Sequence, residues 1–316
     1  MTFGESVFSP DVKEFIDTYL EAGGTEIDTA YVYNKGNCEK LLGEALPQVE
    51  RPYILSTKVN PRITGRLDAD AAYMQVTESL QRLGRESVDT IYLHFPDPAT
   101  PVEGVLAAMT DLHDQGKFTE LGLSNFPAWM IADVCRLCEI NGWVKPTVFQ
   151  GGYNPLARNA EAELFDCLHY FGIRFYAFNP LAGGILSGKY KSFDEEPGEG
   201  RFTNRPNYRG RYWKKSYFEA LDLIRGAAEA HGISVIEATY RWLAFHSALD
   251  GSRGDGILIG ASKLHHLKSN LQAFEGGPLP EDMIGVFEQA WEIARPDAPK
   301  YFTLYKGKGS VGGEKA

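Results

Sequence analysis

The sequence predicts a (β/α)8 barrel, an α/β fold, formed as a single domain. Short segments rich in β-branched and aromatic residues alternate with longer amphipathic segments along the 316 residues. This alternation is typical of parallel strands joined by helical crossovers. No linker or change of composition separates two domains. No Gly-x-Gly-x-x-Gly motif follows the first strand, so an open doubly wound sheet is only the alternative.

Seven segments have the length and residue types of buried strands. They cover residues 25–27, 53–57, 88–93, 118–123, 147–149, 174–177 and 257–259. The eighth strand of the barrel would come first in the chain, with Thr2, Phe3 and Gly4 as its end. We therefore expect the first strand to be truncated.

Eight amphipathic segments alternate with or follow these strands. They cover residues 11–22, 36–46, 68–83, 101–115, 127–140, 158–171, 216–231 and 263–274. Asp68 and Pro101 are placed to begin two of these helices. Glycines follow the ends of four of them, at Gly84, Gly116, Gly142 and Gly172.

Two segments interrupt the alternation. Residues 181–215 form a long connection after the strand at 174–177, and its part from 187 to 215 holds eight Lys or Arg and four Asp or Glu. Long ordered loops in compact domains usually act as lids or binding loops. Residues 304–316 combine glycines with lysines and are expected to be a flexible tail. The barrel domain is thus expected to cover residues 1–303.

The charge of the chain excludes some classes of function. Acidic residues number 42 and basic residues 32, which gives a net charge of −10. Such a field repels nucleic acids and anionic lipids. No stretch approaches the ~20 apolar residues of a membrane span, and the first residues lack the pattern of a signal peptide. We expect a cytoplasmic protein without nucleic-acid or membrane partners.

The four cysteines do not form a disulfide framework. Cys135 and Cys138 have Cys-x-x-Cys spacing, but they lie within a segment of helical periodicity and no second pair follows. Buried thiols on a helix face are therefore favoured over a zinc or redox site. Scattered cysteines of this kind fit a reducing compartment.

Polar residues follow most of the predicted strands. In a barrel, the carboxyl ends of the strands form one rim, and active sites lie there. Any one polar residue at this position could be a cap or a turn residue, but their joint arrival at one rim favours a functional site. The residues concerned are Asp28, Lys58, His94, Ser124, Asn125, Gln150, Asn179 and Ser262.

Four residues carry a specific chemistry. Lys58 beside Asp28 is expected to stay charged and to lower the pKa of the Tyr33 phenol, which would make Tyr33 a usable acid. A neutral His94 can donate a hydrogen bond to a carbonyl oxygen and orient it. Together these groups polarise and protonate a carbonyl, but the hydride must come from a cofactor.

Several blocks in order along the chain resemble those of the aldo-keto reductases. Residues 153–156, 175–184, 188–190, 200–202 and 211–213 are more specific and resemble the aflatoxin-aldehyde and succinic-semialdehyde reductase branch. The resemblance runs from Thr2 to about Phe302. The general blocks are residues 26–33 (Glu-Ile-Asp-Thr-Ala-Tyr-Val-Tyr), 43–46, 56–58, 93–94, 122–126 and 149–150.

The resemblance implies a (β/α)8 carbonyl reductase that uses NADPH, needs no metal and acts on a small carbonyl compound. It implies that Tyr33 is the general acid, that Lys58 and Asp28 tune it, and that His94 orients the substrate. It implies a nicotinamide site of Ser124, Asn125, Gln150 and Phe178. The implied pyrophosphate loop contains Asn179, Pro180, Leu181, Gly183, Gly184, Lys189 and Arg201.

The resemblance also implies a 2′-phosphate segment with Ser262, Lys263, His266 and Asn270. The segment is more basic than is usual in the branch, and Lys263 in the first turn is the better phosphate ligand. A solvated helix face is the alternative for His265 and Lys268. The branch resemblance is also the sole ground for expecting a homodimer.

Tyr208 and Arg211 match substrate-facing positions, together with His94. Arg211 can bind a carboxylate, or it can merely add to the basic loop. The branch carries a second arginine near the C-terminus, and Thr303 stands in its place. We therefore expect neutral aromatic or dicarbonyl substrates to match or exceed a carboxylated aldehyde.

Two other functions remain open from the residues. One is a cofactor-binding regulatory subunit on the same barrel with little turnover, since such subunits can keep all four catalytic residues. The other is a barrel aldolase with Lys58 as a Schiff-base lysine. Asp28 disfavours the aldolase, because an adjacent carboxylate keeps a lysine protonated and non-nucleophilic.

Overall fold

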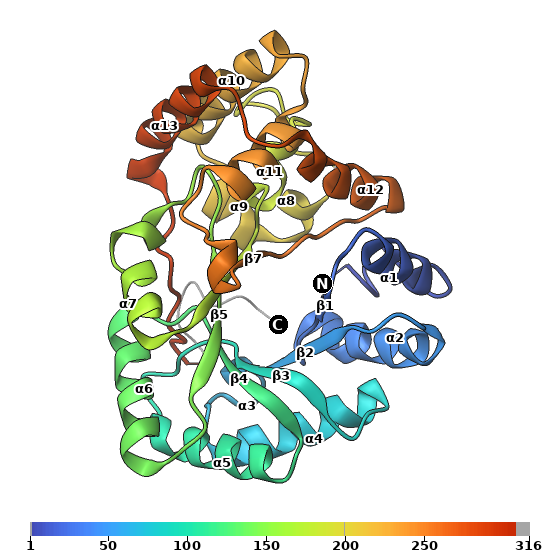
Figure 1. Cartoon of the computed structure of the whole chain (residues 1–316), viewed down its shortest axis with the longest axis vertical. Coiled ribbons are helices and arrows are strands. Elements are labelled where there is room, and N and C mark those ends of the chain that lie inside the picture. Colours follow the sequence, from blue (N-terminus) through green and yellow to red (C-terminus); the bar gives the residue numbers. More distant parts are fainter. Residues whose placement is uncertain (1, 199, 308–316) are drawn as a thin grey trace.

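The computed structural model describes residues 2–198 and 200–307, and its centre is a curled sheet of seven parallel strands (Figure 1). Each strand pairs with the next one in the chain, from β1 to β7. A doubly wound sheet reverses its strand order, so this consecutive order confirms the barrel fold class. The strands are β1 (Glu26–Asp28), β2 (Ile54–Val59), β3 (Val88–Leu93), β4 (Phe118–Ser124), β5 (Pro146–Gly152), β6 (Arg174–Phe178) and β7 (Gly256–Ile257).

The edges of this sheet are β1 and β7. The described residues contain no eighth strand: the chain before α1 forms turns, with one isolated bridge between Phe3 and Val7. This agrees with the expected truncation of the first strand. β7 is shorter than predicted and ends at Ile257 rather than Ile259.

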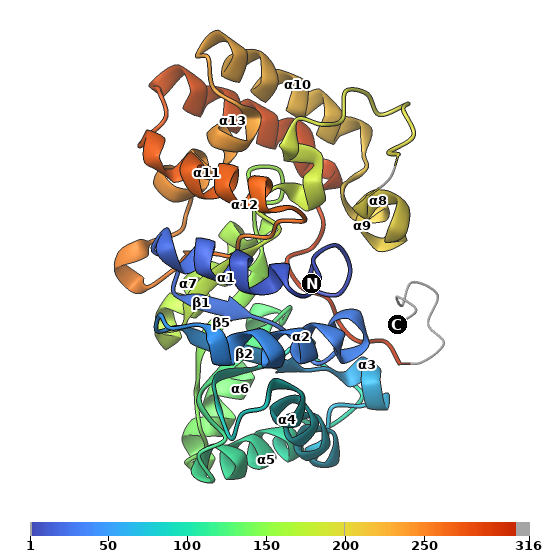
Figure 2. The ribbon, with the colours of Figure 1, turned by 90° about the vertical axis from the view of Figure 1, so that its right-hand side faces the viewer.

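The longer helices surround the sheet, as Figures 1 and 2 show. Within the described ranges, no helix combines the length and apolar character needed to cross a membrane. The helices are α1 (Asp11–Glu21), α2 (Asn37–Ala45), α3 (Pro61–Thr64), α4 (Ala69–Leu83), α5 (Val102–Asp114), α6 (Ala128–Asn141), α7 (Leu164–Phe171), α8 (Arg201–Asn204), α9 (Pro206–Tyr212), α10 (Lys215–Ala230), α11 (Val235–Phe245), α12 (Leu264–Gln272) and α13 (Glu281–Ala294).

The predicted start and stop signals act as expected. The Asp68 side chain accepts a hydrogen bond of 3.0 Å from the backbone N–H of Ala71 and so caps α4. Gly84 and Gly142 end α4 and α6 in the left-handed conformation, with φ of 62° and 66°.

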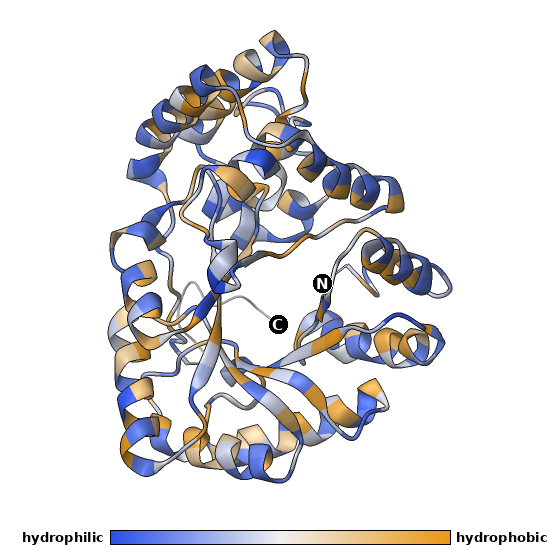
Figure 3. Cartoon of the chain, viewed as in Figure 1, coloured by the Kyte–Doolittle hydropathy of each residue, from blue (hydrophilic) through white to orange (hydrophobic). Residues whose placement is uncertain are grey.

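The apolar stripes of the helices face the interior of the protein. In α4 the buried residues include Ala72, Val76, Leu80 and Leu83, which lie three or four residues apart. Figure 3 shows the resulting contrast, in which hydrophilic and hydrophobic residues occupy different sides of the outer helices. The buried side chains form one contiguous cluster from Val7 to Ala294.

The structure contains two long helices that the sequence analysis did not assign, α11 and α13. Both depart from the strand–helix alternation, because α11 follows α10 directly and α13 follows the last strand–helix unit. α13 packs along α10 through a buried stripe that includes Met283, Phe287 and Ala290 (Figure 2). The predicted helix at 158–171 is also broken, into a 3₁₀ turn at Asn159–Ala162 and α7.

The long connection of residues 181–215 is folded rather than extended. It contains a 3₁₀ segment, η4 (Ala182–Ser187), followed by the short helices α8 and α9, which lie together near the start of α10 (Figure 2). Its aromatic side chains form a local core. The ring of Trp213 lies 5.1 Å from that of Tyr190 and 5.2 Å from that of Phe202.

Cys135 and Cys138 are buried on α6, as predicted. Burial raises the pKa of Cys135 to about 12 and that of Cys138 to about 11. Thiols of this kind are unreactive near neutral pH, because the thiolate is the reactive form.

The end of the chain returns to the rim of the barrel. The backbone N–H of Thr303 donates to the carbonyl of Asn125, and that of Tyr305 donates to the carbonyl of Pro96, both at 3.0 Å. Tyr305 is buried. Of the predicted tail, residues 308–316 lie outside the described residues.

Candidate active site

Asp28 and Lys58 lie side by side at the carboxyl ends of β1 and β2. The Lys58 ammonium donates to Asp28 Oδ1 at 2.5 Å and to the carbonyl of Thr29 at 2.6 Å. Ser56 and Gln150 also donate to Asp28 Oδ1, at 3.2 and 2.7 Å. The carboxylate is thus the common acceptor of three donors, and Lys58 has a fixed position in the rim.

Burial acts against the charge of Lys58. The side chain is 1% exposed, and this burial lowers the pKa of Lys58, while Asp28 raises it back in part. The ammonium also faces the ring of Tyr33, with Nζ 5.2 Å from the ring centroid. Lys58 therefore links the carboxylate of β1 to the phenol of the following turn.

Tyr33 lies at the start of a 3₁₀ turn, η1 (Tyr33–Gly36), just after β1. Burial, followed by the charge of Asp28, raises its pKa well above the ordinary value, and Arg201 lowers it in part. The expectation that Lys58 lowers the pKa of Tyr33 is therefore wrong, because a buried phenolate beside a carboxylate is costly. The phenol stays protonated at neutral pH, which is the form that a proton donor needs.

His94 follows β3, and its ring meets that of Tyr33 edge-on at a centroid distance of 5.8 Å. Burial, with the charges of Lys58 and Arg62, lowers the pKa of His94 well below its ordinary value. The imidazole is therefore neutral at physiological pH, as the sequence analysis expected. A neutral ring carries one hydrogen and donates from one nitrogen only.

Two buried residues near His94 were missed from the sequence. Asn60 places its side-chain nitrogen 3.1 Å from Nδ1 of His94, and Gln75 makes two hydrogen bonds to the backbone of Asn60. Asn60 stands before Pro61, and this dipeptide is a sign of a helix start. Nothing in that local pattern indicates that Asn60 also faces a histidine 34 residues away.

Ser124, Asn125 and Gln150 lie together at the ends of β4 and β5. Asn125 has a φ of 62°, and its amide donates to Ser124 Oγ at 2.9 Å and to the carbonyl of His94 at 3.0 Å. The amide of Gln150, which was expected beside a cofactor, donates to Asp28 in this structure. It therefore joins the Lys58 pair to the rest of the rim.

The loop after β6 has an unusual backbone. Phe178 ends the strand, and Asn179 and Ala182 follow with φ of 56° and 48°. Gly183 and Gly184 also have positive φ, at 70° and 119°. A Cβ at position 183 would come within 2.9 Å of two neighbouring tyrosine rings, so this position requires glycine. The predicted Pro180 and Leu181 lie within the same turn.

A positively charged group lies at the start of α12. Lys263 is the residue before the first turn, and Ser262 Oγ lies 3.3 Å from Nδ1 of His266. The pKa of His266 is lowered first by burial and then by His265, Lys263 and Lys189. The structure thus brings Lys189, from the loop after η4, close to the start of this helix.

Asn270 is buried on α12 and donates to the carbonyl of Gly260 at 3.4 Å. It therefore ties the helix to the turn that precedes it. The expected phosphate residues Ser262, Lys263 and His266 lie at the exposed start of the same helix.

The two expected substrate residues lie on α9. Tyr208 donates to Asn179 Oδ1 at 3.4 Å, and the guanidinium of Arg201 lies 5.0 Å from the Tyr208 ring. Arg211 lines a pocket that is partly open to solvent, together with Asn125, Phe178, Lys300 and Thr303. This pocket connects the nicotinamide residues of the sequence analysis with the end of the chain.

The arrangement can activate a carbonyl group. Tyr33 and the neutral His94 are hydrogen-bond donors whose rings meet at the rim, and the Lys58 ammonium, which donates to Asp28, faces the Tyr33 ring. Such groups can orient a carbonyl oxygen and transfer a proton to it. Side chains do not supply hydride, so reduction there requires a cofactor.

Residues 1–292 match the model of the Aldo/keto reductase family. The human protein named "Aldo-keto reductase family 7 member A3" is 45% identical over 96% of this chain and 95% of its own length. Human "Aflatoxin B1 aldehyde reductase member 2" is 43% identical over 96% of this chain and 88% of its own length. The mouse protein of that name is 44% identical over 91% of this chain and 82% of its own length.

Proposed function

The chain belongs to the aldo/keto reductase family, a family of oxidoreductases that act on carbonyl groups, and from that premise we propose that it reduces aldehydes or ketones to alcohols with NADPH and with Tyr33 as proton donor. The observation that carries this proposal is the meeting of Asp28, Tyr33, Lys58 and His94. They come from four separate segments and contact one another at the rim.

The residues around the rim suit a nicotinamide cofactor. The turn of residues 179–184 contains four positive-φ residues, 179 and 182–184, and turns of this kind are common in anion-binding backbone. Lys189 and Lys263 lie close to His266 at the start of α12, where a helix favours a phosphate group. The nicotinamide would be held by Ser124, Asn125, Gln150 and Phe178. The pyrophosphate would be held by Lys189, Arg201 and the 179–184 turn. The 2′-phosphate would be held by Ser262, Lys263, His266 and Asn270.

The cofactor would supply the hydride, and the chain would supply the proton and the geometry. His94 would donate a hydrogen bond to the carbonyl oxygen and orient it. Tyr33, protonated because burial raises its pKa, would transfer its proton to the same oxygen. The Lys58 ammonium, held in place by Asp28, would then stabilise the phenolate that forms, because the ammonium faces the Tyr33 ring.

The activity is tested by mixing the purified chain with NADPH and 4-nitrobenzaldehyde and following the loss of NADPH absorbance. We expect steady turnover with stoichiometric formation of the alcohol. Tight NADPH binding without turnover across a panel of aldehydes and ketones would instead indicate a cofactor-binding regulatory protein. Borohydride trapping of a carbonyl substrate on Lys58 would indicate a Schiff-base enzyme.

The choice of NADPH over NADH is tested at Lys263. Lys263→Ala should weaken NADPH binding about 10–150-fold, which corresponds to the loss of a charge-assisted contact of roughly 1.5–3 kcal/mol. NADH binding should change little, and both are measured by quenching of tryptophan fluorescence. Lys268→Ala is the matched control, because Lys268 is exposed on the same helix. Equal losses for both cofactors would contradict the assignment.

The substrate class is tested at the pocket of Arg211. We propose neutral aromatic or dicarbonyl substrates, supported by the names of the relatives and by Thr303, which lines the same pocket as Arg211. Lys300 lines it too, but a lysine cannot bind a carboxylate with two parallel hydrogen bonds.

Arg211→Ala should raise KM for succinic semialdehyde and leave KM for 4-nitrobenzaldehyde unchanged, because a remote carboxylate contributes mostly uniform binding. Lys300→Ala is the matched control, because it also removes a cation from this pocket. A strong native preference for succinic semialdehyde would contradict the argument from Thr303. An equal effect of Arg211→Ala on both substrates would contradict the carboxylate assignment.

A further inference from the structure

The contact between Asn60 and His94 determines which ring nitrogen carries hydrogen. The side-chain nitrogen of Asn60 lies 3.1 Å from Nδ1 of His94. An amide nitrogen only donates hydrogen bonds, so Nδ1 must accept. Because a neutral imidazole carries a single hydrogen, that hydrogen lies on Nε2.

The orientation of the Asn60 amide is set by a second contact. Its oxygen accepts a hydrogen bond of 3.0 Å from the backbone N–H of Arg62 and caps α3. If the amide were reversed, its NH₂ group would face that N–H, and two donors would meet. The helix start therefore forces the NH₂ group toward His94.

Gln75 holds Asn60 in this position from α4. The backbone N–H of Asn60 donates to Gln75 Oε1 at 2.8 Å, and Gln75 Nε2 donates to the carbonyl of Asn60 at 3.1 Å. Both side chains are fully buried, with exposed fractions of 0%. Water cannot replace either contact, so the orientation of Asn60 is rigid.

His94 is fixed on its other sides as well. Its backbone N–H donates to the carbonyl of Val59 at 2.9 Å, and its carbonyl accepts from the side chain of Asn125 at 3.0 Å. Its ring stacks on Phe95 at a centroid distance of 4.8 Å. The remaining freedom of the ring is the placement of its hydrogen, and that is what Asn60 controls.

We propose that Asn60, held by Gln75, is a positioning residue that keeps His94 in its Nε2–H form, so that His94 donates a hydrogen bond to the carbonyl oxygen of the substrate. The inference rests on the proposed carbonyl reduction for its consequence. It does not rest on that function for the tautomer itself, which is measurable in the free protein.

The first test is nuclear magnetic resonance of the chain labelled with ¹⁵N-histidine. The two ring nitrogens of His94 should show the shifts of a protonated Nε2 and an unprotonated Nδ1 at neutral pH. The His94 signals are assigned by their loss in His94→Gln. A protonated Nδ1 in the native protein would overturn the proposal, whether or not the protein has activity.

The second test is Asn60→Asp. A carboxylate still caps α3 through one oxygen, but its other oxygen accepts from Nδ1–H and reverses the preference of the ring. The charged and titratable groups that face His94 are Lys58, Arg62 and the phenol of Tyr33, and all of them stay unchanged. The new carboxylate therefore accounts for any change in the titration of His94.

This variant should have a distinctive pH profile. At low pH the doubly protonated ring still donates from Nε2, so kcat should remain near the native value. As the pH rises the ring loses its Nε2 hydrogen, and kcat should fall about 10²-fold, the loss typical of a missing oxyanion donor. Native kcat should not fall in that range. Asn141→Asp, on the exposed end of α6, is the matched control and should follow the native profile.

The outcomes separate the two proposals. An Asn60→Asp variant with native NADPH affinity, a shifted His94 tautomer and the new pH dependence would support the positioning role. A shifted tautomer with an unchanged pH profile of kcat would overturn that role. If the native protein has no turnover, the proposed function fails, while the tautomer measurement still decides whether Asn60 sets the ring.

Discussion

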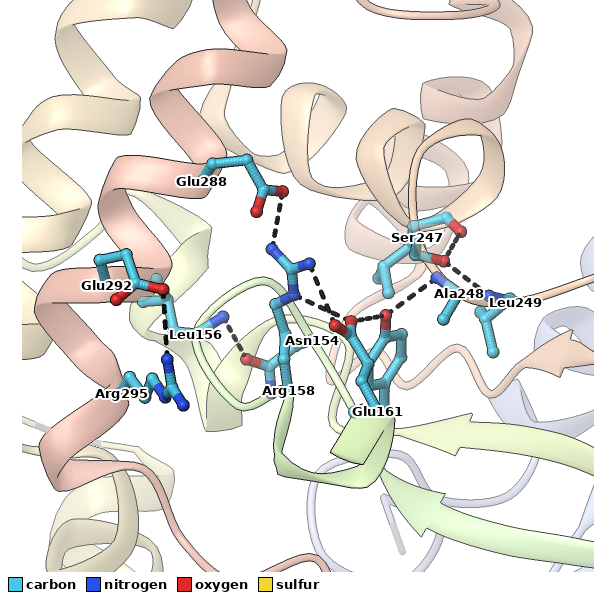
Figure 4. Close-up of polar contacts among 12 residues, drawn as sticks. Asn154, Leu156, Arg158, Glu161, Ser247, Ala248, Leu249, Glu288, Glu292 and Arg295 are labelled. Atoms are coloured by element: carbon cyan, nitrogen blue, oxygen red, sulfur yellow. Dashed lines mark hydrogen bonds and ion pairs between the residues drawn. The ribbon is translucent and has the colours of Figure 1, made fainter. Parts of the chain in front are cut away.

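Two groups of charged and polar side chains in this molecule each contain a close ion pair, but they differ in what the pair does. One is the rim group, which consists of Asp28, Lys58, Tyr33 and His94. The other lies on the outside of the barrel, where Arg158 donates to Glu161 at 2.8 Å and to Glu288 at 2.7 Å (Figure 4). We call the second group the Arg158 network.

The environments shift the pKa values in opposite directions. In the rim group, burial lowers the pKa of Lys58 and His94 and raises that of Tyr33, so every shift favours the neutral form. In the Arg158 network burial opposes the charge too, but the hydrogen bonds that Arg158 donates to Glu161 and Glu288 outweigh burial and raise the pKa of Arg158.

The difference follows from the number of partners. Arg158 has two carboxylates, and Glu161 also accepts from the hydroxyl of Tyr153 at 2.5 Å, which in turn accepts from the N–H of Ala248 (Figure 4). Asp28 is the carboxylate that the rim group shares. Groups with few counter-charges have shifted pKa values that suit proton transfer, whereas a fully paired group contributes to the stability of the fold.

The largest expected effect is the loss of the Tyr33 hydroxyl. Tyr33→Phe removes the proposed proton donor and leaves the cofactor residues in place. General acids contribute about 10²–10⁴-fold to the rate, so kcat should fall by a factor of about 10² or more. NADPH affinity and the melting temperature should stay close to the native values.

Steady-state kinetics with 4-nitrobenzaldehyde measure this effect, and fluorescence quenching measures the affinity. Lys58→Met should also be severe, because the phenolate would lose the neighbouring ammonium. Near-native turnover by Tyr33→Phe would show that Tyr33 is not the proton donor. The rim group would then no longer differ from the Arg158 network by a role in proton transfer.

The second effect concerns stability rather than activity. Arg158→Met leaves Glu161 and Glu288 without their counter-charge, and the free energy of unfolding should fall by about 1–3 kcal/mol. Turnover per folded molecule should not change. Urea unfolding followed by circular dichroism measures the loss.

Arg295→Met provides the matched control, because its pair with Glu292 (3.5 Å) is exposed on both sides (Figure 4). Exposed pairs contribute about 0–1 kcal/mol, so this variant should unfold near the native midpoint. Similar losses of unfolding free energy in the two variants would show that the Arg158 network stabilises the fold no more than the exposed Arg295–Glu292 pair.

The smallest effect is the pH dependence that His94 adds to stability. Because the folded protein lowers the pKa of His94 below that of the unfolded chain, the unfolded state binds a proton first as the pH falls. Stability should therefore decline from about pH 6.5 downward, with a slope of at most about 1.4 kcal/mol per pH unit.

Unfolding of the native protein and of His94→Gln in urea at several pH values isolates this contribution. The native protein should lose more stability between pH 7 and 5 than the variant. His113→Gln is the matched control, because it replaces a half-buried histidine on α5, away from His94. An identical pH dependence of the native protein and His94→Gln would contradict the neutral state of the buried ring.

Much of the fold was predictable because its signals are local. β-branched runs and helical periodicity placed β1 to β6 and helices such as α4 close to their observed bounds, and Asp68 and Gly84 marked the ends of α4. α11 and α13 were missed because they do not belong to the strand–helix alternation on which the prediction depended. α13 packs against α10, and α11 contacts α10, α12 and η4.

The candidate site divides in the same way. The sequence by itself determined which polar residues stand at the ends of parallel strands, and therefore that Asp28, Lys58 and His94 share one rim. Only the tertiary structure decided that Gln150 donates to Asp28 and that Asn60 faces His94. It also decided that burial raises the pKa of Tyr33. The physical reason is that periodicity depends on neighbours along the chain, whereas desolvation and hydrogen-bond pairing depend on residues brought from distant segments.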